Sequence, residues 1–508
     1  MFAQVIGETT YGIDGVKITV EVDVANGLPG FEIVGLPNMA VRESKERVKA
    51  ALRNSDYPFP MTKVTVNLAP ADLKKEGSGL DLPIAIGVLV SAGTLRQRHV
   101  DGKIFVGELS LDGGIRKVSG ALSMIMEAKK SGYKEIYIPV GNAAEGKLIA
   151  GIDVYTPADL KELVEHLLGE AQLQPLPKEN ILQNIERVYS EDFADVKGQP
   201  VARRALEIAA AGGHSILMMG SPGCGKTMLA RRLVTILPQM TEAEALEVTK
   251  IYSIAGMLPE SESIMLERPF RSPHHSISAS ALLGGGSYPR PGEVTLSHNG
   301  VLFLDELPEF ERYTLEMLRQ PLEDGSVNIS RVRAAVTYPS RFLLCCAENP
   351  CPCGYLTDKE HRCTCKQKDI DNYRRKISGP LLDRIDMQIN LVRVEYSEMK
   401  DKKPGESSAV VRKRVEAARA VQLQRLAGTG LYCNAQMTRR EVAQFCRLDA
   451  DAQKVLEKYF AALHLSARSH DRILKVARTV ADLAGSEQIT AAHIAEAIQL
   501  RTNINGKS

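Results

Sequence analysis

The sequence of 508 residues has no long hydrophobic run and almost no net charge. Its most apolar window, LDLPIAIGVLVSAG from Leu80, is shorter than the roughly 18 to 20 residues that cross a bilayer, so no membrane contact is expected. The first residues, MFAQVIGETTYG, lack the basic and apolar regions of a secretory signal, and we expect a cytoplasmic protein. Because the net charge is only +2, any basic footprint for nucleic acid must be local.

The composition is that of a globular protein, with 44% hydrophobic and 25% charged residues and without tandem repeats or low-complexity tracts. Residues 1–170 alternate β-rich and helical segments, which predicts an α/β domain. The polar stretch 171–189 contains two prolines and is predicted to be a linker. Strands and helices alternate again over 190–393, whereas 394–508 show only helical spacing and predict an all-α domain.

A glycine-rich loop follows an apolar strand in the segment HSILMMGSPGCGKTMLARRL. It matches the pattern G-x-x-x-x-G-K-[ST] between a strand and a helix, where backbone N–H groups and the helix N-terminus surround nucleotide phosphates. Lys226 is expected to reach the β- and γ-phosphates, and Thr227 is expected to ligate Mg²⁺. The sequence therefore predicts an ATP site formed by Gly220, Ser221, Pro222, Gly223, Cys224, Gly225, Lys226 and Thr227.

Two adjacent carboxylates follow a second apolar strand in the segment SHNGVLFLDELPEF. A buried parallel strand would carry Asp305 and Glu306 at its carboxyl end. There Asp305 would belong to the Mg²⁺ shell, and Glu306 would orient and polarise the attacking water. The alternative is a strand with an ordinary acidic turn, which the phosphate loop about 80 residues earlier disfavours.

Four of the nine cysteines lie within fifteen residues, in the stretch NPCPCGYLTDKEHRCTC. Zinc binds four thiolates in a tetrahedral arrangement, and two C-x-C pairs in one loop can supply them. We therefore expect a structural zinc site formed by Cys351, Cys353, Cys363 and Cys365. His361 is an alternative ligand, and a redox-sensitive or thiol-rich loop is the competing interpretation because the C-x-C spacing is tight. Cys345 and Cys346 lie in an apolar strand and are expected in the core.

Around these motifs, residues 190–393 resemble the AAA+ ATPases, and within them the magnesium-chelatase-like group, with a P-loop α/β domain and a parallel sheet. The segment DFADVKGQPVARRAL resembles the family's entry segment and implies that Val196 and Gln199 lie near the adenine. RFLLCCAEN ends at Asn349, the sensor-1 position that reads the γ-phosphate. SGPLLDRIDMQI places Arg384 at the arginine-finger position, which serves the ATP of the neighbouring subunit. A local ion pair with a neighbouring aspartate is the alternative for Arg384.

The segment HLSARSHDRILKVARTVADL resembles the sensor-2 helix of the AAA+ lid. The resemblance implies that Arg468 contacts the nucleotide, with Arg472 as the second choice. A solvated helix face is the alternative for Arg468. Residues 394–508 are therefore expected to form an all-α lid.

The first 170 residues resemble the Lon protease domain, which has an S5-like fold. The resemblance is carried by VGELSLDGGIRKVSGALSMIMEAKK and KEGSGLDLPIAIGVLVSAG. Leu122 stands where that domain has its catalytic lysine, so we expect the fold without the peptidase chemistry. Ser78 with Lys75 or Lys117 is the substitute pair that a peptidase would need.

An S5-like domain joined to a chelatase-type AAA+ module is the arrangement of the ComM/YifB family, and this resemblance covers nearly the whole chain. It implies a ring-forming homo-oligomer, expected to be a hexamer, that uses ATP and Mg²⁺ to move on DNA and promote branch migration in natural transformation. The segment LEDGSVNISRVRAAVTYPSRFLL resembles the pre-sensor-1 hairpin of helicases, with Arg331 and Arg333 as contacts to DNA phosphates or as solvated charges. The alternative function is a chelatase-like motor that remodels a protein partner without DNA.

Overall fold

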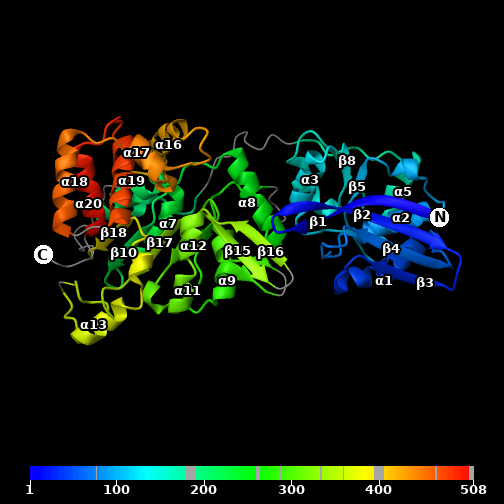
Figure 1. Ribbon diagram of the computed structural model, residues 1–508, viewed down its shortest axis with the longest axis horizontal. Helices are drawn as coiled ribbons and strands as arrows, with labels where there is room; N and C mark the ends of the chain where they lie inside the picture. Colours follow the sequence, from blue (N-terminus) through cyan, green and yellow to red (C-terminus); the bar gives the residue numbers. More distant parts are fainter. Residues whose placement is uncertain are drawn as a thin grey trace. The chain divides into compact units, whose positions relative to one another are not determined.

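The computed structural model describes residues 1–75, 77–178, 189–258, 264–286, 289–331, 334–358, 360–393, 405–463 and 466–502 (Figure 1). The chain forms two compact units. The first unit comprises Met1–Ile185 and Glu242–Met265, and the second comprises Glu186–Thr241 and Leu266–Ser508. Within the described ranges no helix has both the length and the apolar composition for crossing a membrane.

The first unit contains a seven-stranded mixed sheet in the order β3-β4-β2-β1-β5-β8-β9. Its strands are β1 (Phe2–Tyr11), β2 (Asp14–Ala25), β3 (Gly30–Val34), β4 (Lys63–Ala69), β5 (Lys103–Phe105), β8 (Glu135–Tyr137) and β9 (Asp153–Tyr155). β1, β2 and β4 pair antiparallel, whereas β5, β8 and β9 pair in parallel. A separate two-stranded ribbon is formed by β6 (Glu108–Leu109) and β7 (Ile115–Arg116).

The apolar window at Leu80 forms α2 (Asp81–Ser91), and every residue of this helix is buried. A short helix that is apolar on all sides is stable only when protein covers all of its faces, and the apolar residues of α2 lie in the core of the first unit. The other helices of this unit are α1 (Met39–Asn54), α3 (Ala121–Lys130), α4 (Ala143–Lys147), α5 (Leu160–Leu168) and α8 (Glu242–Ala255).

Helix α8 belongs to the first unit although it follows the phosphate loop in the sequence. The Ser253 hydroxyl donates a hydrogen bond to the buried carboxylate of Glu145 at 2.5 Å, and the Gly120 amide donates to the Ser253 carbonyl at 3.2 Å. Glu145 also accepts from the Leu122 amide at 3.0 Å. The predicted boundaries place residues 242–265 in the 190–393 segment, and they do not anticipate this arrangement.

The second unit contains a five-stranded parallel sheet in the order β11-β14-β17-β10-β18. Its strands are β10 (Ile216–Gly220), β11 (Phe270–Arg271), β14 (Val301–Leu304), β17 (Leu343–Glu348) and β18 (Met387–Leu391). β10, β14 and β17 are fully buried, as near-continuous apolar runs in a parallel sheet require. The carboxyl ends of these three strands carry the phosphate loop, the acidic pair and Asn349.

The helices of this domain are α6 (Pro200–Gly212), α7 (Lys226–Ile236), α9 (Ala279–Leu283), α10 (Glu293–Leu296), α11 (Arg312–Glu316), α12 (Arg319–Asp324), α13 (Gln367–Arg374) and α14 (Gly379–Leu382). Two ribbons accompany them, β12 (Gly284–Gly285) with β13 (Arg290–Pro291), and β15 (Ser326–Arg331) with β16 (Ala334–Pro339).

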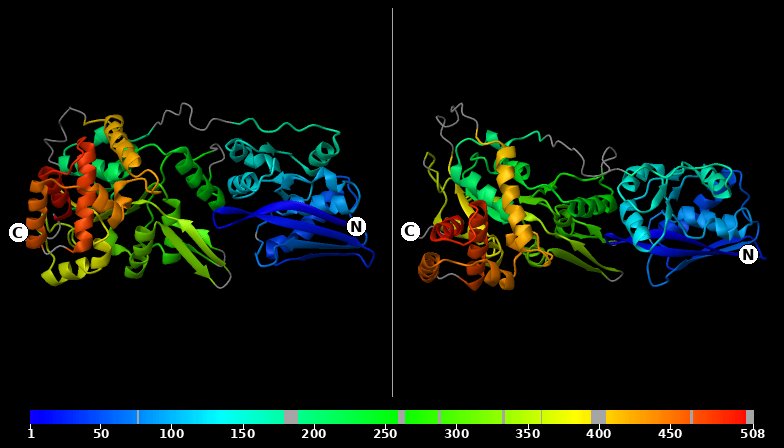
Figure 2. Two further views of the ribbon diagram at one scale, coloured as in Figure 1. Left: turned by 45° about the horizontal axis from the view of Figure 1, so that its top comes forward. Right: turned by 90° about the horizontal axis from the view of Figure 1, so that it is seen from above.

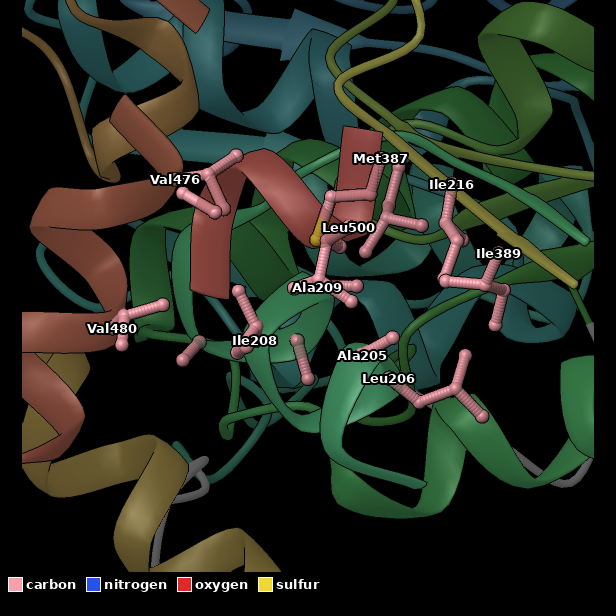
Figure 3. Packing of buried hydrophobic residues seen from close by; sticks show 14 of the residues in the cluster. Ala205, Leu206, Ile208, Ala209, Ile216, Met387, Ile389, Val476, Val480 and Leu500 are labelled. Carbon is pink, nitrogen blue, oxygen red and sulfur yellow. The ribbon is translucent and has the colours of Figure 1, made fainter. Parts of the chain in front are cut away.

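The C-terminal part is helical, with α16 (Ser408–Arg425), α17 (Arg439–Phe445), α18 (Ala450–Leu463), α19 (Ala467–Leu483) and α20 (Ala491–Thr502). Figures 1 and 2 show these helices, coloured orange to red, gathered in one group. Their apolar faces share one core with α6 and the parallel sheet. Figure 3 shows Val476, Val480 and Leu500 of this helical region near α6 and strand residues such as Met387 and Ile389.

Candidate nucleotide and metal sites

The phosphate loop joins the end of β10 to the start of α7, as the motif predicts. Gly223 and Gly225 have φ values of 79° and 90°, which L side chains rarely adopt, so glycine is required at both turns of the loop. Cys224 is buried and lies close enough to Gly220 that a Cβ at position 220 would approach its Sγ to 2.6 Å. Cys224 therefore packs the inner side of the loop.

Lys226 connects the loop to the neighbouring strand. Its Nζ donates to the carbonyls of Gly220 and Ser221 at 2.6 and 3.2 Å, and to Oδ1 of Asn349 at 3.0 Å. The parallel pairing of β10 with β17 brings Asn349 to this place. The predicted γ-phosphate sensor thus lies within hydrogen-bond distance of the predicted phosphate-binding lysine.

The two predicted Mg²⁺ ligands also meet. The Thr227 hydroxyl donates to Oδ2 of Asp305 at 2.7 Å, so both oxygens border one point between α7 and β14. Hydroxyl and carboxylate oxygens are the donors that Mg²⁺ accepts, and the pair fits that ion. Glu306 follows with φ of 52°, and its amide donates to Oδ1 of Asp305 at 2.9 Å. This left-handed backbone conformation is costly for glutamate and is typical of functional sites.

Sequence reasoning missed two groups beside this site. Glu348 immediately precedes Asn349 and is buried; burial raises its pKa to about 7, against the opposing charges of Arg374 and Lys226. A carboxylate at the end of an otherwise apolar strand was the available signal. Nδ1 of His275 lies 3.7 Å from the Glu306 carboxylate, and its ring contacts His274 with centroids 4.0 Å apart. No local pattern in the sequence links these two histidines to Glu306.

The predicted adenine-side residues lie at the start of α6. Val196 is buried in the core of the second unit, and Gln199 precedes α6 with a left-handed φ of 57°. The side-chain amide of Gln199 donates to the carbonyl of Val392, which directly follows β18. This bond ties the entry segment to the edge strand of the sheet.

Arg384 follows α14, and its guanidinium binds Glu323 on α12. The predicted alternative was a pair with a neighbouring aspartate, but Asp386 instead accepts from Arg472 and lies 3.3 Å from Nδ1 of His214. Although burial alone would raise the pKa of Asp386, the charge of Arg472 and the hydrogen bond from His214 hold it below its ordinary range. Arg472 therefore joins α19 to the sheet, whereas the more exposed Arg468 binds Glu323.

The four clustered cysteines converge. Their sulfur atoms all lie within 4.8 Å of one another, and three of the S–S distances are 3.4, 3.6 and 3.7 Å. Four thiolates at about 2.3 Å from a tetrahedral zinc would be about 3.8 Å apart, so the cluster fits that ion. His361 is not part of the cluster: its ring contacts Tyr355 in a tilted arrangement, and its Nδ1 lies 3.4 Å from Asp358. Cys345 and Cys346 are buried in β17, as predicted.

The cysteine loop lies against the phosphate loop. A Cβ at Gly354 would approach Cδ of Pro222 to 2.6 Å, so the backbone of Gly354 packs closely against the Pro222 ring. Asp358 of the cysteine loop accepts a hydrogen bond from the Ser221 side chain. The cysteine cluster and the nucleotide loop therefore form one continuous structure.

The predicted DNA-binding hairpin is present as β15 and β16, with Val327, Ile329 and Val336 buried on one face. Arg331 ends β15, but its side chain and the whole of Arg333 lie outside the described residues. A second group of basic residues lies on and beside α13, and all of its members are exposed: Lys366, Lys368, Arg374, Arg375 and Lys376.

The substitute peptidase pair in the first unit is not assembled. The Ser78 hydroxyl donates to the carboxylate of Glu108, whereas the buried ammonium of Lys75 donates to the carbonyl of Pro70. Leu122 is buried in α3. A serine that donates to a carboxylate, while the paired lysine donates to a carbonyl, is not an activated nucleophile of the Ser–Lys kind.

Three family models match the chain in succession. The model described as subunit ChlI of Mg-chelatase matches residues 20–142, the model for magnesium chelatase, subunit ChlI, matches 192–399, and the model for the C-terminal part of that subunit matches 405–501. The chain is 45% identical to the uncharacterized protein YifB of Escherichia coli K12 over 495 residues, 96% of this chain and 95% of that protein. It is 42% identical to competence protein ComM of Haemophilus influenzae over 506 residues, 99% and 98% of the two chains.

The chain belongs to the ComM/YifB family. Residues 192–399 match the magnesium-chelatase-like AAA+ domain of this family, and the sites above occupy the carboxyl edge of its parallel sheet. The predicted fold class is confirmed: a mixed α/β first unit, a P-loop domain with a parallel sheet and a helical C-terminal region. The AAA+ domain also assigns this protein to the ATPases as a class.

Proposed function

We propose that this ComM/YifB protein is a ring-forming, ATP-driven DNA motor that promotes branch migration. The observation that carries the ATPase part is the meeting of Lys226 with Asn349 and of Thr227 with Asp305 at adjacent strand ends. These contacts bring together, from distant parts of the sequence, the groups that phosphoryl transfer requires.

Each side chain has a distinct task in hydrolysis. Lys226 and the loop amides bind the triphosphate, and Asn349 senses its γ-phosphate. Thr227 and Asp305 hold Mg²⁺, which neutralises charge that develops on the phosphate oxygens. Glu306 orients and polarises the attacking water. Arg384 serves the ATP of the adjoining subunit, so hydrolysis requires a ring of subunits, which we propose to be a hexamer.

Two features support DNA as the substrate that is moved. The first is the β15–β16 hairpin, which precedes the sensor strand β17 and carries Arg331 at the end of β15. The second is the group of exposed basic residues around α13, which can bind phosphates without reading bases. The name of the Haemophilus influenzae relative, competence protein, supports a competence-related role.

We propose further that the four clustered cysteines bind a structural zinc ion. Their sulfur separations suit a tetrahedral thiolate site, and the loop between the γ-phosphate sensor and Arg384 would be shortened and made rigid by a metal. Because this loop contacts Pro222 and Ser221, the same ion would support the phosphate loop.

A chelatase-like motor that remodels a protein partner is the rival function. The family model for residues 20–142 carries the chelatase subunit's name, so the first unit does not separate the two functions. The exposed basic residues around α13 favour DNA.

The test is the ATPase rate with forked DNA, duplex DNA or an unfolded protein added. Stimulation by forked DNA above that by duplex, with loss of stimulation at high salt, is the expected result. The matched variant Lys366→Gln/Lys368→Gln should keep the basal rate and lose part of the stimulation. Stimulation by unfolded protein and by no DNA would favour the rival.

A further inference from the structure

One carboxylate joins two arginines that come from distant parts of the second unit. Oε1 of Glu323 on α12 accepts from Nη2 of Arg384 at 2.5 Å and from Nη2 of Arg468 at 3.2 Å. Arg384 follows α14, and Arg468 lies in the first turn of α19. Glu323 is therefore the point at which the AAA+ domain and the C-terminal helices meet beside the predicted arginine finger.

The Arg384 side chain has few other contacts, so its ion pair with Glu323 determines its orientation. Its side chain is only 5% exposed, and Nη1 donates to the carbonyl of Pro380 at 2.8 Å. Nε is buried and has no partner among the described residues. Glu323 thus supplies the charged contact to a guanidinium that is otherwise held by a single carbonyl.

The backbone of Arg384 is fixed separately. Its carbonyl accepts from Nη1 of Arg472 and from the Ser215 hydroxyl, so α19 and the start of β10 hold the main chain in place. The direction of the side chain then depends on the far end of the guanidinium. Glu323 controls that end, and a misplacement of about 1 Å in a catalytic group can cost about 100-fold in rate.

We propose that Glu323 is a positioning residue that aims Arg384, and Arg468 with it, toward the subunit interface. This inference rests on the proposed function, in which Arg384 acts on the ATP of the adjoining subunit. Glu323 is 43% exposed, so the three side chains reach the surface through Glu323 and the 52% exposed Arg468. The hydrogen bond from Arg384 also keeps the pKa of Glu323 below its ordinary value, so the carboxylate stays charged.

The experiment compares Glu323→Gln, Glu323→Ala and Glu323→Asp in the full-length, assembled protein. We expect kcat to fall about 10-fold for Gln and about 100-fold for Ala, with the KM for ATP within about 3-fold of wild type, because ATP binding does not use Glu323. Glu323→Asp should recover part of the rate. Asp324→Asn is the matched control, since Asp324 is the next residue on α12, is exposed, and has no ion pair in the described part of the chain.

Subunit mixing separates positioning from general damage. Glu323→Gln subunits keep an intact phosphate loop, and Lys226→Ala subunits keep an intact Arg384, so a mixed ring should regain turnover at sites that combine the two. A variant that has lost its overall fold or its ability to assemble would not be rescued. Absence of rescue, or a Glu323→Gln rate equal to or above wild type, overturns the proposal.

The same ATPase assay with Arg384→Ala distinguishes a failure of the Glu323 proposal from a failure of the arginine-finger assignment. An inactive Arg384→Ala protein beside a fully active Glu323→Gln protein rejects only the role of Glu323. A fully active Arg384→Ala ring instead rejects the finger assignment within the proposed function.

Discussion

Glu306 occupies a backbone conformation that few glutamates adopt, with φ of 52° directly after a buried strand. The strain is maintained because β14 fixes the preceding residues and the Glu306 amide binds the Asp305 carboxylate. As a result, Asp305 points toward Thr227, while the Glu306 carboxylate lies near His275. Two adjacent acids thus have separate partners, which suits a metal ligand and a water-activating base.

Glu306→Gln should abolish turnover while ATP stays bound. The amide keeps the shape of the side chain but is a far weaker base, so kcat should fall by about 100-fold or more, with the Kd for ATP within about 3-fold. Glu309→Gln is the control, because Glu309 is a nearby acid that pairs with Lys376 at 3.2 Å. Single-turnover hydrolysis and nucleotide binding measure the two quantities. Loss of ATP binding in Glu306→Gln would contradict the assigned role.

Glu8 of β1 is a different kind of buried acid. Its side chain is fully buried, and neither carboxylate oxygen has a hydrogen-bond partner among the described residues. Burial, with a contribution from Glu127 and an opposing one from Lys17, raises the pKa of Glu8 from 4.5 to about 9. The folded chain therefore keeps this proton across neutral pH, whereas the unfolded chain releases it.

Glu8→Gln should stabilise the first unit in a pH-dependent way. The stability that Glu8 contributes is fully present below pH 4.5 and is lost as the pH rises toward about 9. Gln has no proton to lose, so we expect the gain at pH 8 to exceed the gain at pH 5 by about 4 kcal/mol. Denaturation and amide hydrogen exchange in β1 measure the effect, with the exposed Glu32→Gln as control. A gain that is equal at both pH values would contradict the linkage.

At the scale of elements, the cysteine loop acts as a support for the phosphate loop. Gly354 contacts Pro222, and Asp358 accepts from Ser221, so both loops share one packing surface. A segment of this length without regular structure would be costly to order, and a metal ion at the four thiolates would supply the missing free energy.

The double variant Cys351→Ser/Cys363→Ser should lose zinc and bind ATP more weakly. Wild type should contain about one zinc per chain and the variant none, with an ATP Kd raised about 10-fold because Pro222 and Ser221 lose their support. Asp358→Ala should keep zinc and weaken ATP binding by a smaller factor. Elemental analysis and nucleotide titration provide the readouts. A metal-free wild type that is folded and active would end the zinc assignment.

Local patterns predicted the elements that are defined by neighbouring residues. The phosphate loop, the strand before Asp305 and the paired cysteines each lie within one short segment, so spacing alone indicated their chemistry. Asn349 and Arg384 required the family resemblance, because a single polar residue at a strand end or loop has no spacing of its own.

The remaining features depend on contacts between distant segments. Helix α8 packs with α3 through Ser253 and Gly120, although its own sequence gives only a helical period. The contact of Glu323 with Arg384 joins residues separated by the β15–β16 hairpin, strand β17, the cysteine loop and two helices. Such pairings are decided by tertiary packing, which periodicity and propensity do not encode.

At the scale of the whole molecule, the proposed active site is divided between chains. One chain provides Lys226, Asp305 and Glu306, and the adjoining chain provides Arg384. Within a single chain, the Arg384 guanidinium binds Glu323, and Lys226 binds loop carbonyls and Asn349. A single chain therefore contains both the phosphate-binding residues and Arg384, but it does not bring them together in one site.

Turnover per chain should therefore fall when the protein is diluted below its assembly concentration. A monomer lacks the neighbouring cation, whose removal typically costs about 1,000-fold or more in kcat, so the rate should follow the assembled fraction measured by sedimentation. Forked DNA should move the midpoint to lower concentration, because a ligand that binds the ring stabilises it by mass action. Arg384→Ala is the control, since its residual rate should not change on dilution. Constant turnover per chain in a monomeric wild type would contradict the shared site.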